Sequence, residues 1–164
     1  MDRLTAIKRK FRILERDVLL LIAFPLPVFA LVYLYTTGDT MSIDVPDLPG
    51  FLNFFVLGVA SALLLFQYNG FRNSMKKLRR GSKDLEEKMS EYAKATLTRF
   101  WLLFWVGIIC AAGLLFYGNP GFTVLYAVNL MFVSLGKPTP DRIVKSLNLK
   151  GEEKDMVFEI NRRD

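Results

Sequence analysis

Histidine is absent from this chain of 164 residues, and cysteine occurs once, at Cys110. Histidine is the usual general base near neutral pH and the commonest metal ligand, so the most frequent catalytic and zinc-binding arrangements are excluded. A single cysteine forms no intramolecular disulfide and provides no paired-cysteine metal motif. A glycine-rich phosphate loop and an activated serine motif are missing as well. The sequence therefore predicts no catalytic residue, no metal site and no cofactor, in a protein that is not an enzyme.

Charged side chains are missing from four long stretches, in a chain that is 52 % hydrophobic and contains fourteen Phe. At about 1.5 Å per residue, the first three stretches reach about 27–30 Å as helices, which matches the hydrocarbon thickness of a bilayer. The fourth is shorter, so a re-entrant or interfacial segment is the alternative to a full span there. The stretches are residues 18–37, 51–68, 100–117 and 121–136.

Lys and Arg are also absent from two connections, residues 38–49 and 118–121. Because basic residues are retained on the cytoplasmic side during insertion, both connections are predicted to lie outside and both termini inside. This partition favours a full fourth span, since otherwise the basic tail would lie outside. We expect an all-α integral membrane four-helix bundle of two antiparallel hairpins, within residues 18–136. The complete charge bias and the lack of a eukaryotic sorting signal favour a multi-pass protein of a bacterial inner membrane.

Residues 1–17 have the residue spacing of an N-terminal amphipathic helix. The pattern predicts a cytoplasmic arm that lies on the inner leaflet and contacts anionic lipid headgroups. Packing on the protein's own cytoplasmic loops, or on a partner, is the alternative. The apolar face consists of Leu4, Ile7, Phe11 and Leu14, and the predicted membrane-surface residues are Lys8, Arg9, Lys10, Arg12 and Arg16.

Residues 70–99 are predicted to form a cytoplasmic helical hairpin between the second and third spans. Gly81 interrupts the first arm, and Ser82 is placed to cap a second helix over Lys83–Arg99. Each arm carries an apolar stripe, and the stripes either pack on each other or form a docking face for another protein. The stripes are Phe71, Met75 and Leu78 on the first arm and the candidate docking residues Leu85, Met89 and Tyr92 on the second.

Residues 137–164 are predicted to form a cytoplasmic tail with two short helices. Thr139 can cap the first helix, which has Pro140 at its start and extends to about Leu147. The second helix is predicted over Glu152–Asn161. Its candidate docking residues are Met156 and Ile160.

Nucleic acid is not an expected partner, despite the net charge of +6. Basic and acidic residues nearly balance in the tail, and no aromatic side chains are interleaved with the basic run Lys76, Lys77, Arg79 and Arg80. Lipid headgroups or solvent fit that run better. Anionic lipid and either a protein partner or further copies of this chain are the expected partners.

Small and polar side chains within the spans predict how the helices meet. Glycine and alanine four residues apart allow close helix packing, either within the bundle or between copies. Pro25 and Pro27 predict a break in the first span. Isolated polar residues either form interhelical hydrogen bonds or line a polar pathway. The packing pairs are Gly58 with Ala62 and Gly107 with Ala111, and the polar residues are Asn53, Gln67 and Asn129.

Two classes of function are compatible with these features. The first is a non-catalytic accessory or scaffold subunit that presents cytoplasmic helices to a partner. The second is a small channel or transporter formed by homo-oligomerisation. Because polar residues are sparse in the spans, and none of the spans has a charged residue, the sequence favours the accessory subunit.

Overall fold

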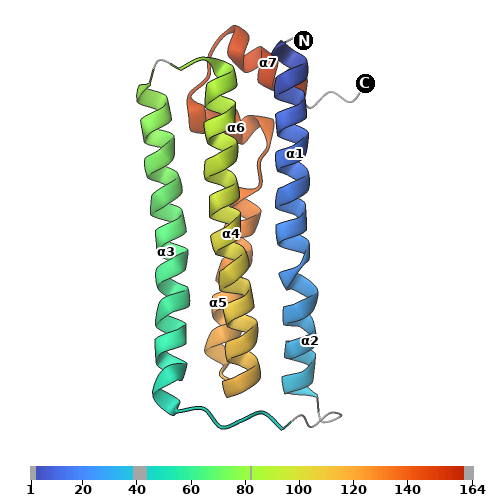
Figure 1. Cartoon of the computed structure of the whole chain (residues 1–164), viewed down its shortest axis with the longest axis vertical. Helices are drawn as coiled ribbons and strands as arrows, with labels where there is room; N and C mark the ends of the chain where they lie inside the picture. Colours follow the sequence, from blue (N-terminus) through green and yellow to red (C-terminus); the bar gives the residue numbers. More distant parts are fainter. Residues whose placement is uncertain (1–2, 39–43, 82, 161–164) are drawn as a thin grey trace.

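The computed structural model describes residues 3–38, 44–81 and 83–160, and the regular secondary structure in these ranges is entirely helical (Figure 1). Four long rods run side by side along the long axis, and two short helices lie at one end. The helices are α1 (Arg3–Ala23), α2 (Pro25–Thr37), α3 (Gly50–Arg80), α4 (Leu85–Tyr117), α5 (Pro120–Gly136), α6 (Pro140–Leu147) and α7 (Glu152–Ile160).

Three helical segments are long and apolar enough to cross a membrane. The first is Leu4–Thr37, which comprises nearly all of α1 and the whole of α2. The second is α3 and the third is α4. This length and composition are those of a multi-pass membrane protein. The fourth rod, α5, has 17 residues and is about 25 Å long, so its crossing of the membrane stays a prediction.

The rod formed by α1 and α2 is interrupted at Phe24, as Pro25 and Pro27 predicted (Figure 1). The amide of Phe24 still donates to the carbonyl of Leu20 at 3.2 Å, and α2 then begins with Pro25, where a helix needs no amide donor. Pro25 is buried beside Gly107 of α4. The break therefore shapes the rod around its neighbour.

Helix α4 occupies the centre of the bundle, with contacts to α1, α2, α3 and α5. Its N-cap is Asp84, whose carboxylate accepts a hydrogen bond from the amide of Leu85 at 2.9 Å. The helix thus begins two residues later than predicted, and the predicted cap, Ser82, lies outside the described residues. At its other end, Gly118 adopts the left-handed conformation with a φ of 59°, which allows the chain to reverse into antiparallel α5.

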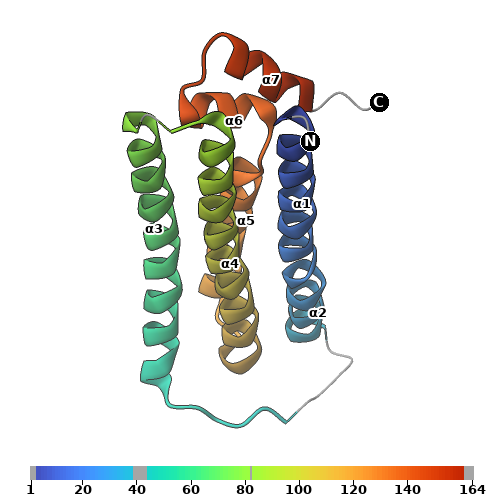
Figure 2. The same cartoon turned by 45° about the horizontal axis from the view of Figure 1, so that its top comes forward.

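Helices α6 and α7 lie across one end of the bundle, and we call them the tail layer (Figure 2). Both predicted tail helices are confirmed, with Thr139 as the cap of α6: its hydroxyl accepts from the amide of Arg142 at 3.4 Å. Helix α6 packs on α3, and α7 packs on α1. This end of the bundle is the one predicted to be cytoplasmic.

The predicted position of the N-terminal arm, with its apolar face in the lipid surface, is wrong. Residues 3–17 are part of α1, which runs alongside α4, and Ile7 and Leu14 are 1 % and 2 % exposed. Phe11 is buried as well. The apolar stripe is removed from water by packing on α4 and α7. The arm therefore packs on the protein's own helices, which was the alternative prediction. Contact of the five basic residues with lipid headgroups stays a prediction.

Most of the candidate docking residues of the hairpin and tail are buried, which the docking hypothesis did not expect. Leu85, Met89 and Tyr92 are 2–3 % exposed, and Ile160 is 6 % exposed. The ring of Tyr92 lies 6.1 Å from the ring of Phe71, so the two apolar stripes of the hairpin pack on each other. Met156 is half-buried against the same core. The four buried candidates therefore hold the tail end of the bundle together and offer no surface to a partner, whereas Met156 stays partly accessible.

Candidate functional site: a basic groove

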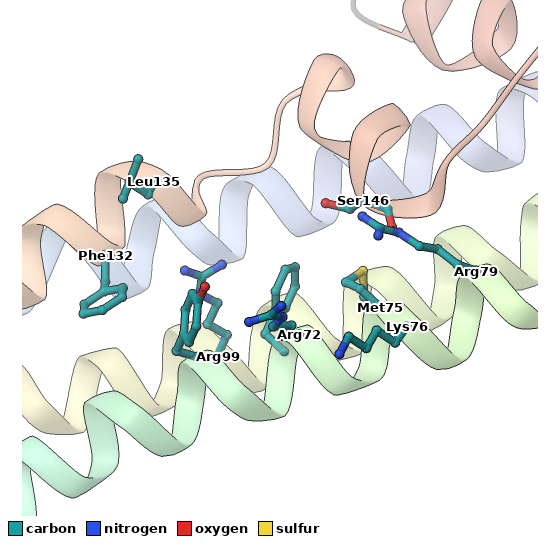
Figure 3. Close-up of a pocket in the computed structure, with 10 residues that line it drawn as sticks. Arg72, Met75, Lys76, Arg79, Arg99, Phe132, Leu135 and Ser146 are labelled. Carbon is teal, nitrogen blue, oxygen red and sulfur yellow. The ribbon is translucent and has the colours of Figure 1, made fainter.

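A groove of about 420 Å³ runs along α3 near the tail end of the bundle (Figure 3). Its walls come from α3, α4, α5 and α6. Half of its lining is apolar or aromatic, and the only charged side chains in the lining are basic. We call it the basic groove; it is lined by Tyr68, Phe71, Met75, Phe132 and Leu135, by Arg72, Lys76, Arg79 and Arg99, and by Ser146.

Arg99 is the most buried of the four basic side chains, although α4 here is still outside the predicted span. Its Nε atom donates a hydrogen bond to Oε1 of Gln67 at 2.9 Å, and its guanidinium carbon lies 4.8 Å from the centre of the Phe71 ring. On the opposite side is Gly136, where an added Cβ atom would lie 3.1 Å from that carbon. The end of α5 can approach Arg99 this closely because residue 136 has no side chain.

Arg79 fixes the wall of the groove that α6 provides. Its Nε donates to the carbonyl of Ser146 at 2.7 Å, and its Nη2 donates to the carbonyl of Lys145 at 3.0 Å. Both carbonyls are in the last turn of α6, where helix carbonyls lack internal partners and favour a cation. Arg79 therefore has a structural role in attaching the tail layer to α3.

Arg142 performs a similar task at the end of α5. Its Nη1 donates to the carbonyls of Ser134 and Lys137, at 2.8 and 2.9 Å. These bonds connect the last turn of α5 to α6 across the buried residues Gly136 and Pro138. Arg142 thus holds the α5–α6 connection, while Arg79 attaches the other end of α6 to α3.

The electrostatic character of the groove is strongly positive. No carboxylate is among its lining residues, and the ion pairs that the structure gives for the described residues involve other cations: Lys10, Arg16, Lys83 and Lys88. Loss of hydration on burial lowers the pKa of the Arg99 guanidinium from its ordinary value. A site of this charge repels cations and favours an anion.

The three polar residues predicted for the spans are not brought together in one cavity. Asn53 accepts a hydrogen bond from Asn119 Nδ2 at 3.1 Å near the end of the bundle opposite the tail layer, and Gln67 bonds Arg99 near the groove. Asn129 is 3 % exposed and borders a space of only about 10 Å³. That volume is too small for a pathway. The predicted interhelical bonds are found for Gln67 and, through the α4–α5 turn, for Asn53. For Asn129 the prediction is not borne out, because its buried Oδ1 has no hydrogen-bond partner among the described residues.

The two predicted packing pairs differ in position. Gly107 and Ala111 are buried, and a Cβ atom on Gly107 would lie 3.1 Å from that of Pro25 and 3.3 Å from the Tyr126 ring. Gly58 and Ala62 are exposed, and nothing lies within 4 Å of a Cβ built on Gly58. Packing within the bundle is therefore found for Gly107 and Ala111 but not for Gly58 and Ala62, for which packing between copies stays a prediction.

Sequence reasoning missed Arg99, which it placed at the end of the second arm of the cytoplasmic hairpin. One signal was available: Arg99 directly precedes an uncharged stretch, and Gln67 is a polar residue at the corresponding end of the previous one. Comparisons of this chain with models of protein families, with curated proteins and with solved structures give no match. Function is therefore inferred from the residues and their geometry.

Proposed function

We propose that this chain is a non-catalytic accessory or scaffold subunit of a membrane assembly, which presents its tail layer to a partner protein. The observation that supports this role is the fixed attachment of the tail layer to the bundle. Two arginine clamps, Arg79 and Arg142, connect α6 to α3 and α5. Within the layer, Val157 of α7 and Ile143 of α6 are fully buried.

One surface of the tail layer that remains available to a partner is the outward face of α7. Phe158 is 39 % exposed there, and the Lys154 ammonium lies 5.9 Å from the centre of its ring. Glu152, Asp155 and Glu159 are exposed on the same short helix. An exposed aromatic side chain surrounded by charges has the composition of an interface anchor and its polar rim.

The bundle itself favours an interaction role over transport. Asn53 and Gln67 are used in contacts between helices, and the space beside Asn129 is too small for a path. A channel formed by several copies would need polar side chains on an exposed face of a span. The exposed face of α3 instead carries large aromatic side chains, namely Phe51, Phe54, Phe55 and Phe66.

The test is purification of the tagged protein from its native membranes in a mild detergent, followed by mass analysis of the intact particle. A second protein in fixed stoichiometry is expected. Phe158→Ala should weaken its binding by about tenfold or more, as truncation of an interface anchor does. Phe51→Ala is the matched control, because this aromatic residue is 70 % exposed at the opposite end of the bundle.

Two results would contradict the proposed function. A particle composed solely of copies of this chain would remove the partner and would favour the oligomeric channel. Equal loss of the partner in the Phe158→Ala and Phe51→Ala variants would show that the tail layer is not the contact surface.

A further inference from the structure

We propose that the basic groove binds the phosphate-bearing headgroup of an anionic membrane phospholipid, from the leaflet at the tail end of the bundle. This lipid site is independent of the partner surface on α7. Either can be present without the other, because they are formed by different residues.

The predicted spans place the groove where a bilayer changes from hydrocarbon to headgroup. Tyr68 is the last residue of the predicted second span, and Leu135 is one residue from the end of the fourth stretch. They are 45 % and 63 % exposed, so both present apolar surface to lipid. Arg72 and Lys76 follow on the same helix, about 6 and 12 Å beyond Tyr68. This order, apolar and then cationic, matches a phospholipid with its acyl chains toward the membrane centre.

No carboxylate lines the groove to compensate its positive charge. Arg72 and Lys76 are exposed, and among the described residues neither has a carboxylate partner. Their spacing of four residues places both on one face of α3. A basic pocket between membrane helices at the membrane surface is a recurrent site for anionic headgroups.

Arg99 is the strongest single indication that the groove suits an anion. Its Nε is occupied by Gln67, but the structure gives its two terminal nitrogens no hydrogen bond among the described residues. Figure 3 shows its guanidinium in the space between α3 and the α5–α6 connection. A buried cation without a counter-charge is unfavourable, and a phosphate can accept two parallel hydrogen bonds from a guanidinium. A phosphate in the groove would therefore offset the desolvation of Arg99.

The size and lining of the groove favour a lipid over free phosphate. Its volume of about 420 Å³ exceeds what an inorganic phosphate fills and is in the range of small-molecule sites. Free phosphate would leave the wall of Phe132 and Leu135 uncovered. A phospholipid covers this wall with its glycerol and first methylene groups while its phosphate contacts the arginines.

The test is a titration of the lipid-depleted protein in detergent with phosphatidylglycerol, observed by native mass spectrometry, with phosphatidylcholine, which is zwitterionic and has no net charge, as the comparison. Arg72→Gln combined with Lys76→Gln should weaken phosphatidylglycerol binding by about tenfold or more, since each basic residue near anionic lipid contributes about fivefold. The matched control is Lys77→Gln with Arg80→Gln, which removes the same charge from exposed positions of α3 outside the groove. The control should change binding by less than about threefold.

Three outcomes would overturn the proposal. Equal weakening in both double variants would show general attraction to a basic surface. Equal binding of phosphatidylcholine would remove the requirement for an anionic headgroup. Displacement of the lipid by inorganic phosphate at the same concentration would assign the groove to the free anion.

Arg99→Gln extends the test to the buried cation. Arg99 also connects α4 to α3 through Gln67, so circular dichroism must show unchanged helical content in this variant. A further loss of phosphatidylglycerol binding is then expected, and unchanged binding would contradict the role of Arg99. The Arg72 and Lys76 variants decide the proposal even where Arg99→Gln fails to fold.

Discussion

Helices α3 and α4 both carry a glycine followed four residues later by an alanine, but only α4 packs this pair against other helices. Gly107 and Ala111 are buried beside Pro25 and Tyr126, whereas Gly58 and Ala62 face outward from α3. The spacing of small residues thus indicates only that another helix can approach closely without steric clash. Position in the bundle decides whether the protein uses it.

The two helices differ because α4 is surrounded and α3 is at the edge. In the most apolar part of each helix, 44 % of the residues of α4 are buried inside the protein, against 17 % for α3. In a membrane, lipid tails are as apolar as a protein interior, so an apolar residue is equally suited to either environment. Burial of an apolar residue in a span therefore depends on which helices surround it.

The largest effect on stability is expected at Tyr92, in the part of α4 beyond the predicted span. Tyr92 is 2 % exposed against α3, so Tyr92→Ala should lower the free energy of unfolding by roughly 3–5 kcal/mol, the range for loss of a large buried aromatic side chain. Thermal or denaturant unfolding in detergent micelles measures it. Glu91→Ala, an exposed neighbour, should change stability by less than about 0.5 kcal/mol. Unchanged stability of Tyr92→Ala would return Tyr92 to the docking hypothesis.

Much of the fold follows from local signals in the sequence. Pro25 and Pro27 mark the break of the first rod, and Thr139 caps the helix that Pro140 begins. The apolar spacing of Ile7 and Phe11 correctly indicated a buried face, but their burial against α4 instead of lipid depends on packing between distant segments. Periodicity gives the face of a helix and leaves its neighbour undetermined.

The candidate site was less accessible to sequence reasoning. Arg99, Gln67 and Gly136 belong to three helices, and each is unremarkable within its own segment. An arginine beside an uncharged stretch normally extends toward water or headgroups. Only the approach of α5 to α4 at Gly136 shows that this arginine is enclosed. The groove is therefore a property of helix assembly, with no local motif.

A smaller loss of stability is expected when glycines on the buried side of α4 are replaced by alanine. A Cβ atom on Gly113 would overlap the fully buried ring of Phe122, so Gly113→Ala should cost about 1–3 kcal/mol through overpacking. Gly107→Ala should cost less, because its tightest contact, with Pro25, is 3.1 Å. Melting temperatures in one detergent would rank the variants. Equal stability of Gly113→Ala and the parent protein would mean that α5 is not packed on α4 as described.

The smallest effect is expected at Gly58, on the exposed side of α3. Nothing lies within 4 Å of a Cβ atom there, and alanine favours a helix over glycine by about 1 kcal/mol. Gly58→Ala should therefore leave the stability of the isolated chain unchanged or raise it by up to about 1 kcal/mol. Measurements in detergent and in native membranes should agree if this face meets only lipid. A loss of stability confined to native membranes would mean that another helix packs against Gly58 there, since only a close neighbour can make one added methyl group unfavourable.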